Sequence, residues 1–425
     1  MNLTLNKHDS HEVVDWKKVM IQLFLFMILP PVIGLPYIIW SIWSEKKKNK
    51  TDYYIFFACL AAYYATINAT KAPNGDQVQY FVAYNNVPII GFVKSLIYIY
   101  GLRYYQDSSV STISGEFMNG IYNYIGYYLT FGQYYLFVFI YTFVEYMLVF
   151  AGFYKFCLNL KRPHFPIVCG ALILGFFYLY FQYLLQIQKQ FFAQSIMMYV
   201  LGTLSYEGKM KPKLWVLTFV ALFTHATMIW FFPFLFIAKF RRPLNRNNLL
   251  FLSMIFAGLI FFAPSIAGDM TAGTDKNALS YSVGRVANAE NDNDGVSLNM
   301  LQVIVVGIPI GFITIKQLWF DRKRLKGYSA FILNVVLMLL LSIFAMSRQP
   351  IAQYRYFMMI FAFMPFVYPF AFNSINKRNL FLKFLSFVMI GWFYVQFEFI
   401  IYDFAPEWAI VSVPPVGLVS FFNPF

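Results

Sequence analysis

Apolar runs of membrane-spanning length dominate this chain. A helix needs roughly 20 apolar residues, within a range of about 17–25, to cross a bilayer, and lipid-exposed backbone is satisfied only in helices or closed barrels. Ten runs meet this requirement, and together they predict an all-α integral membrane protein, a polytopic helical bundle in which residues 1–425 form a single transmembrane domain. The predicted spans are Val19–Trp43, Tyr53–Ala69, Tyr134–Tyr154, Phe165–Leu185, Gln190–Tyr206, Asn248–Ala263, Asn299–Ile315, Ser329–Met346, Tyr356–Phe372 and Leu380–Tyr402.

The composition agrees with this class. Hydrophobic residues make up 60% of the chain and charged residues 12%, whereas a soluble domain carries roughly 45–50% and about 25%. A soluble domain, a disordered chain and a disulfide scaffold are therefore excluded. Cys59, Cys157 and Cys169 fall in or beside apolar runs without metal-ligand spacing, so we interpret them as small core residues.

An eleventh apolar segment, Leu214–Phe240, is too long for one simple span and too short for two. When it is treated as a broken re-entrant hairpin, 22 of the 33 Lys and Arg residues and only 4 of the 19 acidic residues fall in the connections on one side. These connections are then cytoplasmic by the positive-inside rule, which fails if the segment crosses once. The arrangement has 12 membrane segments, with both termini outside; a further pair within residues 70–133 would make 14. The basic connections are Ser44–Asp52, Lys155–His164, Glu207–Lys213, Lys239–Asn247, Lys316–Gly327 and Asn373–Lys383.

The opposite, outer face carries the longest polar segments, which are residues 70–133, 264–298 and the tail 403–425. The first is rich in aromatic residues and contains an apolar stretch, Val87–Leu102, that predicts a helix lying in the membrane interface. No phosphate-binding loop, dinucleotide fingerprint or zinc-protease motif is present. We therefore expect a function on the outer face with no metal site and no cofactor. The net charge of +14 follows the topology and forms no stripe of the kind that nucleic acid needs.

Two groups of basic side chains are candidates for chemistry. His225 lies near the tip of the predicted hairpin, where it acts as a base, binds a polar substrate, or satisfies the turn as a structural residue. Arg348 and Arg355 bracket a short outer turn and suit bidentate recognition of phosphate or pyrophosphate; the alternative is contact with lipid headgroups. Arg103 and Arg285 are the other outer arginines, with the same two interpretations.

Acidic and aromatic candidates lie in the first outer segment. Asp76 and Glu116 are suited to accept a proton from a sugar hydroxyl, or are simply solvated carboxylates. Tyr80 and Tyr84 follow Asp76 and suit stacking on sugars, although anchoring in the membrane interface explains them equally well. Glu145 lies within a predicted span and needs a partner that the sequence does not identify.

The chain resembles bacterial polysaccharide polymerases of the Wzy/EpsG type in four places, in order, from about residue 70 to residue 372. Asn74-Gly75-Asp76, then Tyr80 and Tyr84, is similar to the family's G-x-D-Y-x-x-Y segment, although Gln77 replaces its first tyrosine. The second place is Gly115-Glu116-Phe117 with Ile121-Tyr122, which is similar to the family's E-x-G-F region. The third is a block in which Phe192-Ala193-Gln194-Ser195 is similar to F-R-Q-x, Lys209–Lys213 to K-K, and Phe223-Thr224-His225-Ala226-Thr227 to H-x-S-A. The fourth is Arg355-Tyr356-Phe357, which is similar to a late R-Y segment.

This resemblance implies an integral glycosyltransferase of the bacterial inner membrane, with a GT-C-like fold and an active site facing the periplasm or exterior. It would join oligosaccharide repeat units carried on undecaprenyl pyrophosphate into O-antigen, as in lipopolysaccharide, or exopolysaccharide. The growing chain would move onto the non-reducing end of an incoming unit. The implied partners are this lipid-linked oligosaccharide, membrane lipids and a chain-length regulator protein.

We assign roles within this hypothesis. Arg348 and Arg355, with Arg285 third, would stabilise the leaving pyrophosphate without a metal ion, and His225, then Asp76 or Glu116, would accept the proton. Ala193 stands where the family commonly has an arginine, so Lys189 is predicted to replace it. A lipid-linked oligosaccharide flippase, an O-antigen ligase-like transferase and a solute transporter are the alternatives.

Overall fold

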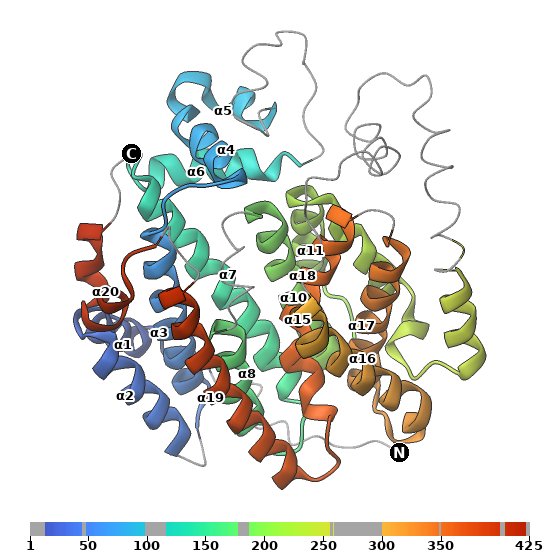
Figure 1. Ribbon diagram of the computed structural model, residues 1–425. Helices are drawn as coiled ribbons and strands as arrows, with labels where there is room; N and C mark the ends of the chain where they lie inside the picture. The colour runs from blue at the N-terminus through green and yellow to red at the C-terminus, as the bar shows by residue number, and fades with distance from the viewer. Residues whose placement is uncertain are drawn as a thin grey trace, which may run out of the picture.

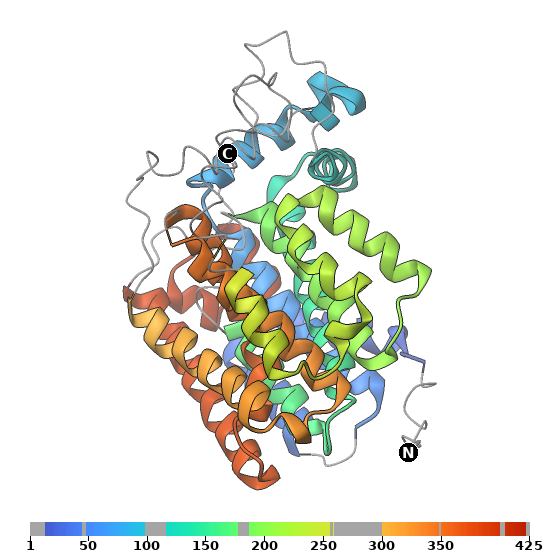
Figure 2. The ribbon, with the colours of Figure 1, turned by 90° about the vertical axis from the view of Figure 1, so that its right-hand side faces the viewer.

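The computed structural model describes residues 13–44, 48–97, 116–176, 187–255, 258, 300–347, 350–399 and 404–421, and within these ranges it is helical, without strands (Figure 1). Most helices run roughly along one direction, and α4, α5 and α6 lie across one end of the resulting bundle, as the view turned by 90° also shows (Figure 2). The helices are α1 (Trp16–Ile28), α2 (Pro31–Ser44), α3 (Lys50–Ala69), α4 (Asp76–Asn85), α5 (Val87–Ile97), α6 (Met118–Leu129), α7 (Tyr134–Cys157), α8 (His164–Phe176), α10 (Gln188–Glu207), α11 (Pro212–Thr224), η2 (Ala226–Phe231), α12 (Phe232–Phe236), η3 (Ala238–Arg241), α15 (Met300–Gln302), η4 (Val303–Gly307), α16 (Ile308–Ile315), η5 (Lys316–Phe320), η6 (Arg322–Arg324), α17 (Gly327–Ala345), α18 (Pro350–Val367), η7 (Tyr368–Phe370), α19 (Ile375–Phe399), α20 (Glu407–Ser412) and η8 (Pro415–Phe421).

Four helices of the described residues are long and apolar enough to cross a membrane. The prediction of an all-helical protein is therefore confirmed, whereas the count of ten to twelve membrane segments is not. One reason is that some apolar segments form short helices, such as α2 with 14 residues and α11 with 13. The four helices are Tyr134–Cys157, Met300–Phe320, Gly327–Ala345 and Ile375–Val395.

The first predicted span, Val19–Trp43, is wrong, because these residues form two helices. Leu29 is extended, as the residue before a proline tends to be, and it separates α1 from α2. Each helix is about 20 Å long at 1.5 Å per residue, which is shorter than a bilayer core of about 30 Å.

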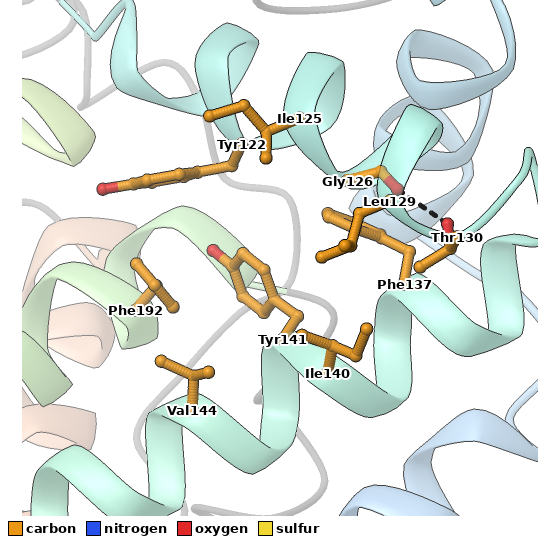
Figure 3. Close-up of a pocket in the computed structure, with 10 residues that line it drawn as sticks. All are labelled: Tyr122, Ile125, Gly126, Leu129, Thr130, Phe137, Ile140, Tyr141, Val144 and Phe192. Carbon is orange, nitrogen blue, oxygen red and sulfur yellow. Dashed lines mark hydrogen bonds between the residues drawn. The ribbon is translucent and has the colours of Figure 1, made fainter.

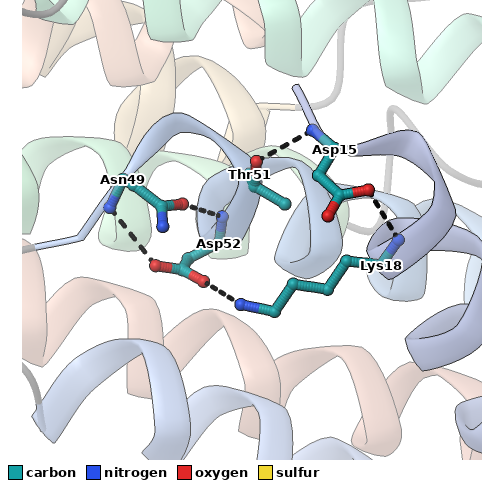
Figure 4. A network of polar contacts seen from close by, with 5 residues as sticks. All are labelled: Asp15, Lys18, Asn49, Thr51 and Asp52. Atoms are coloured by element: carbon teal, nitrogen blue, oxygen red, sulfur yellow. Dashed lines mark hydrogen bonds and ion pairs between the residues drawn. The ribbon is translucent and has the colours of Figure 1, made fainter. Parts of the chain in front are cut away.

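A polar network ties the start of α1 to the start of α3 (Figure 4). The Asp15 backbone N–H donates to the Thr51 hydroxyl at 3.0 Å, and the Lys18 ammonium donates to the Asp52 carboxylate at 3.2 Å. Asp52 also forms a capping box with Asn49 that starts α3. Residues 15–18 therefore lie at the same end of the bundle as residues 49–52, and the prediction that the N-terminal segment lies opposite the basic connections is wrong for these residues.

The basic connections gather at one end of the bundle, which we call the basic end and define by Lys161, Arg246 and Arg378. Contacts between different connections hold them there, so the structure confirms that they share one end; the membrane face that this end meets stays a prediction. The linking contacts are hydrogen bonds from Arg378 to the Lys161 carbonyl (3.0 Å), from Arg246 to the Trp319 carbonyl (3.5 Å) and from Gln317 to the Phe370 carbonyl (3.0 Å), and cation–π contacts of Lys155 with Tyr206 and Lys383 with Phe165.

Residues 212–241 form two antiparallel arms. The rings of Trp215 and Phe236 are 4.7 Å apart, and those of Phe219 and Phe232 are 6.4 Å apart, so α11 pairs with the returning η2 and α12. The return ends at the basic end, where Asn334 of α17 donates to the Phe240 carbonyl. The turn between the arms, at His225, therefore lies toward the opposite end of the bundle.

The core of the bundle packs α7 between α3 and α10. A side chain at Gly152 or Gly202 would lie within 3 Å of the facing backbone, because the carbonyl of Gly152 is only 2.0 Å from the position of a Cβ at Gly202. Small residues at such crossings let membrane helices approach closely. This contact fixes α10 against α7, and α10 carries the first side chain of the candidate site.

Residues 404–421 pack on the N-terminal helices. The Ala405 backbone N–H donates to the Thr70 hydroxyl at 3.1 Å, at the end of α3 away from the basic end. α20 contacts α2, and η8 contacts both α1 and α3. The last described residues therefore cover the pair of helices that is too short to cross a bilayer.

Candidate functional site

Two segments far from Glu116 in the sequence converge on its carboxylate. The Lys189 ammonium, at the start of α10, lies 2.7 Å from Glu116 Oε2. The Ala226 backbone N–H donates to Glu116 Oε1 at 3.1 Å, and His225 Nε2 lies 4.0 Å from the same oxygen. We call Glu116, Lys189, His225 and the Ala226 N–H the carboxylate cluster. It lies away from the basic end, because α10, with 20 residues, is about 30 Å long and its other terminus, Glu207, is ion-paired with Lys211.

Contacts with α6 and the residue before it hold the turn between the two arms in place. α11 ends at Thr224, whose hydroxyl is 2.9 Å from the Tyr122 hydroxyl of α6. The ring of Phe117 lies 5.0 Å from that of Phe223. Since Glu116 directly precedes Phe117, these contacts place its carboxylate under the Ala226 N–H.

The backbone at His225 sets the role of its imidazole. His225 is extended (φ −154°, ψ 125°), and its Nδ1 accepts from the Thr227 backbone N–H at 3.4 Å and lies 2.7 Å from the Thr227 hydroxyl. An imidazole nitrogen that accepts a hydrogen bond carries no proton, so the proton of the neutral ring is on Nε2. In this arrangement His225 presents a donor toward Glu116 rather than a free basic nitrogen.

The electrostatics favour an ionised Glu116. Burial acts to raise the pKa of this carboxyl group. The charge that His225 acquires at low pH, the charge of Lys189 and the hydrogen bonds from Lys189 and the Ala226 N–H outweigh it, so the pKa lies well below its usual range. Lys189 is only 3% exposed, whereas Glu116 is 21% exposed. A carboxylate partly open to a ligand is thus held charged by a buried cation.

Arg355 lies beside the carboxylate cluster. Its charge acts on His225, and its backbone carbonyl accepts from Gln190 Nε2 at 3.1 Å, while Gln194 donates in the same way to Met359 one turn later. The two glutamines therefore fix α18 against α10. The half-buried Arg355 guanidinium forms no ion pair within the described ranges, so it is available to an anionic ligand.

The other predicted residues lie elsewhere. Asp76 is exposed at the first turn of α4 and makes no ion pair with any described residue. Tyr80 is buried, and Tyr84 is fully buried with its hydroxyl 2.6 Å from that of Thr130. This places Tyr84 in the packing of α4 against α6, and its role in stacking on sugars stays a prediction. Arg103, Arg285 and Arg348, and the outer loop 264–298, lie outside the described residues.

Some features of the site have no sequence signal. The sequence points to Glu116 and Lys189 separately, as a loop carboxylate and as a replacement for an arginine, but nothing at 73 residues' separation predicts their ion pair. The Ala226 N–H is a backbone group, so a search of the sequence for reactive side chains does not find it. Among the described residues, no group of three or more His, Cys, Asp or Glu side chains is placed to hold a metal ion.

Glu145, for which the sequence identifies no partner, has no hydrogen-bond partner in the part of the chain that the structure describes. It lies on α7 with 1% of its surface exposed, and neither carboxylate oxygen has a hydrogen-bond partner among the described residues. The Tyr141 side chain lies one turn away on the same helix. No hydrogen bond or ion pair among the described residues links Glu145 to the carboxylate cluster.

Comparison with known proteins gives one family. The model of the family described as "EpsG family" matches residues 93–406, which include Glu116, Lys189, His225 and Arg355. No curated protein and no solved structure matches the chain. The match covers the whole carboxylate cluster and α18, and excludes α1 to α4.

Proposed function

The chain belongs to the EpsG family, and from this premise we propose that it is a membrane glycosyltransferase that polymerises oligosaccharide units carried on a lipid pyrophosphate into O-antigen or exopolysaccharide. The family supports a polysaccharide polymerase in general terms. The lipid carrier, which we take to be undecaprenyl pyrophosphate, and the membrane face are our proposal. The observation that supports it best is the convergence of Lys189 and the Ala226 N–H on the Glu116 carboxylate, beside the Arg355 backbone that Gln190 holds at the start of α10.

The two charged groups suit the two halves of a glycosyl transfer. A carboxylate accepts a hydrogen bond, and then a proton, from the sugar hydroxyl that attacks. An arginine binds a pyrophosphate through two parallel hydrogen bonds and stabilises the charge that develops on it. Within the carboxylate cluster, Lys189 balances Glu116, so the charge of Arg355 remains for the leaving group.

The proposed reaction balances with these groups alone. The acceptor hydroxyl oxygen forms a bond to the anomeric carbon of the growing chain, and the bond from that carbon to the pyrophosphate oxygen breaks. The electron pair leaves with the lipid pyrophosphate, which Arg355 and the predicted Arg348 stabilise. The hydroxyl proton passes to Glu116 as the new glycosidic bond forms. Arginines supply the positive charge, so we propose a metal-independent reaction.

His225 has a positioning role in this scheme. Its Nε2–H points toward Glu116, and its Nδ1 caps the following turn, which aims the Ala226 N–H at the same carboxylate. The sequence alone favours His225 as the base. The hydrogen bonds of its ring now favour Glu116 as the proton acceptor, with His225 orienting it.

We propose that the carboxylate cluster faces the periplasm or the exterior. The basic end lies at the opposite end of the bundle, and connections rich in Lys and Arg remain cytoplasmic. Lipid-linked units would therefore be joined after they have crossed the cytoplasmic membrane, which is the inner membrane where a cell has two.

A reconstituted assay tests this function. The full chain in liposomes, supplied with one chemically defined undecaprenyl-pyrophosphate-linked oligosaccharide, is expected to give a ladder of products that differ by one repeat unit. Gel electrophoresis of the released glycans measures it. Empty liposomes are the control, and a product that stays at one unit with several different repeat units contradicts polymerisation.

Lys189 is expected to set the pH range of the reaction. Because its charge and hydrogen bond lower the pKa of Glu116, wild type keeps an ionised carboxylate until the pH falls well below 4.5, the ordinary value. Lys189→Gln removes both of these effects while the burial of the carboxyl group remains, so the pKa of Glu116 rises. The acid limb of the pH–activity profile should therefore move to higher pH.

The matched control for this variant is Lys211→Gln, which removes a lysine from an ion pair with Glu207 at the other end of α10. Its profile should follow wild type. Coincident acid limbs for Lys189→Gln and wild type would show that Lys189 does not control the ionisation of Glu116.

A further inference from the structure

An apolar groove lies between α6, α7 and α10 (Figure 3). It encloses about 140 Å³. Its one hydroxyl-bearing aliphatic residue, Thr130, donates to the Gly126 carbonyl at 2.7 Å, so the hydroxyl is satisfied within the protein. The lining residues are Tyr122, Ile125, Gly126, Leu129, Thr130, Phe137, Ile140, Tyr141, Val144 and Phe192.

One side of the groove is open on the outside of the bundle. Ile125 and Leu129 of α6 are 57% and 59% exposed, and Ile140 and Val144 of α7 are each 38% exposed. Large aliphatic side chains that point outward from membrane helices contact lipid rather than water. An occupant of the groove therefore enters from the bilayer.

The other side of the groove ends at the carboxylate cluster. The rings of Tyr122 and Tyr141 lie 4.8 Å and 4.4 Å from that of Phe192 and close the groove. The Tyr122 hydroxyl contacts Thr224, the residue before His225. Phe192 lies about one turn after Lys189 on α10. A molecule whose tail fills the groove thus has its head beside the carboxylate cluster.

We propose that this groove binds the pyrophosphate-proximal isoprene unit of a polyprenyl lipid, with the phosphate groups directed toward Arg355. This inference rests on the proposed function and identifies where the lipid part of the substrate lies. A cavity of about 150 Å³ accommodates a benzene molecule, so this groove is wide enough for one methyl-branched, unsaturated five-carbon unit, and four aromatic rings line it. An apolar lining with charged groups at one end matches an amphipathic phosphate ester.

Tryptophan substitutions that fill the groove test the proposal. Val144→Trp and Ile140→Trp place an indole in the groove from its lipid-exposed side. The matched control is Val216→Trp, the same valine-to-tryptophan substitution on α11, where Val216 is 61% exposed and does not line the groove. Native mass spectrometry of the full chain in detergent, titrated with undecaprenyl phosphate, measures binding. Wild type and Val216→Trp should bind alike, and both groove variants about tenfold more weakly.

A phosphate-bearing lipid in this groove is either a polyprenyl phosphate or an ordinary phospholipid. Dioleoyl phosphatidic acid, which has a phosphate head and unbranched tails, represents the second and distinguishes the two. The proposal expects wild type to prefer undecaprenyl phosphate. Equal binding of the two lipids, or unchanged binding by both groove variants, would overturn it, as the groove would then hold ordinary membrane lipid or nothing specific. If one variant does not fold, the other still decides. The two proposals fail in different ways. If wild type binds undecaprenyl phosphate selectively and the groove variants do not, but wild type does not polymerise, the groove is a lipid site and the proposed function is wrong.

Discussion

Replacing Glu116 with glutamine is expected to reduce polymerisation by about 10³-fold, the scale on which general acid–base groups contribute. Glutamine keeps the size of the side chain and an oxygen that accepts from the Ala226 N–H, but it cannot take a proton from the acceptor hydroxyl. The assay is the repeat-unit ladder in liposomes, read as the rate of the first joining step. Single-unit substrate should persist while the variant still inserts into the membrane.

A stability effect must be separated from this chemical effect. Lys189 is 3% exposed, and removing the partner of a buried charge costs about 3–5 kcal/mol. The double variant Glu116→Gln/Lys189→Met removes both charges, so it should regain the melting temperature of wild type and remain inactive. Glu207→Gln, which breaks the ion pair at the other end of α10, should polymerise normally. Recovery of activity in the double variant would make the pair purely structural.

Replacing Arg355 with alanine is expected to reduce polymerisation by about 10²-fold, the lower end of the range for losing one group that stabilises developing charge. The guanidinium makes no ion pair within the described ranges, and the contact that fixes α18 uses the backbone carbonyl of Arg355, which the substitution keeps. The loss should therefore appear in the rate of transfer and not in the melting temperature. The melting temperature and the ladder are measured on the same sample.

Two further variants define the role of Arg355. Arg355→Lys keeps the charge without the planar fork, so its activity should lie between those of wild type and Arg355→Ala. Arg246→Ala removes an arginine that stacks on Trp319 at the basic end and should leave the ladder unchanged. Equal activity of Arg355→Ala and wild type would remove this residue from pyrophosphate binding.

The sequence predicts the helical class well and the crossings less well. Hydropathy depends on local composition and predicts which segments are helical. The distribution of Lys and Arg depends on the side of the membrane and predicts that the basic connections lie together. Both are blind to where a helix stops. Pro30 interrupts a 25-residue apolar run, and only the contacts of Asp15 with Thr51 and Lys18 with Asp52 reveal that the chain turns back there.

The sequence predicts which residue types belong to the candidate site, but not which of those residues contact one another. His225 stands out because an ionisable group is costly at membrane depth, and Lys189 because Ala193 stands where the resembled family commonly has an arginine. Their meeting at Glu116 depends on how α6 lies across the end of the bundle, which composition does not encode. The same limit applies to Tyr84, since an aromatic residue in an interfacial segment looks alike whether it is buried against Thr130 or exposed to a sugar.

The packing of residues 404–421 on α1, α2 and α3 has a consequence for biosynthesis. The first two helices emerge from the ribosome long before the segment that covers them, and neither is long enough to stay in lipid as an independent transmembrane anchor. The nascent chain must therefore keep this pair sheltered, by the insertion machinery or by α3, until residues 404–421 have been synthesised. Truncation at residue 403 should produce chains that quality-control proteases remove, even though every residue of the carboxylate cluster is present.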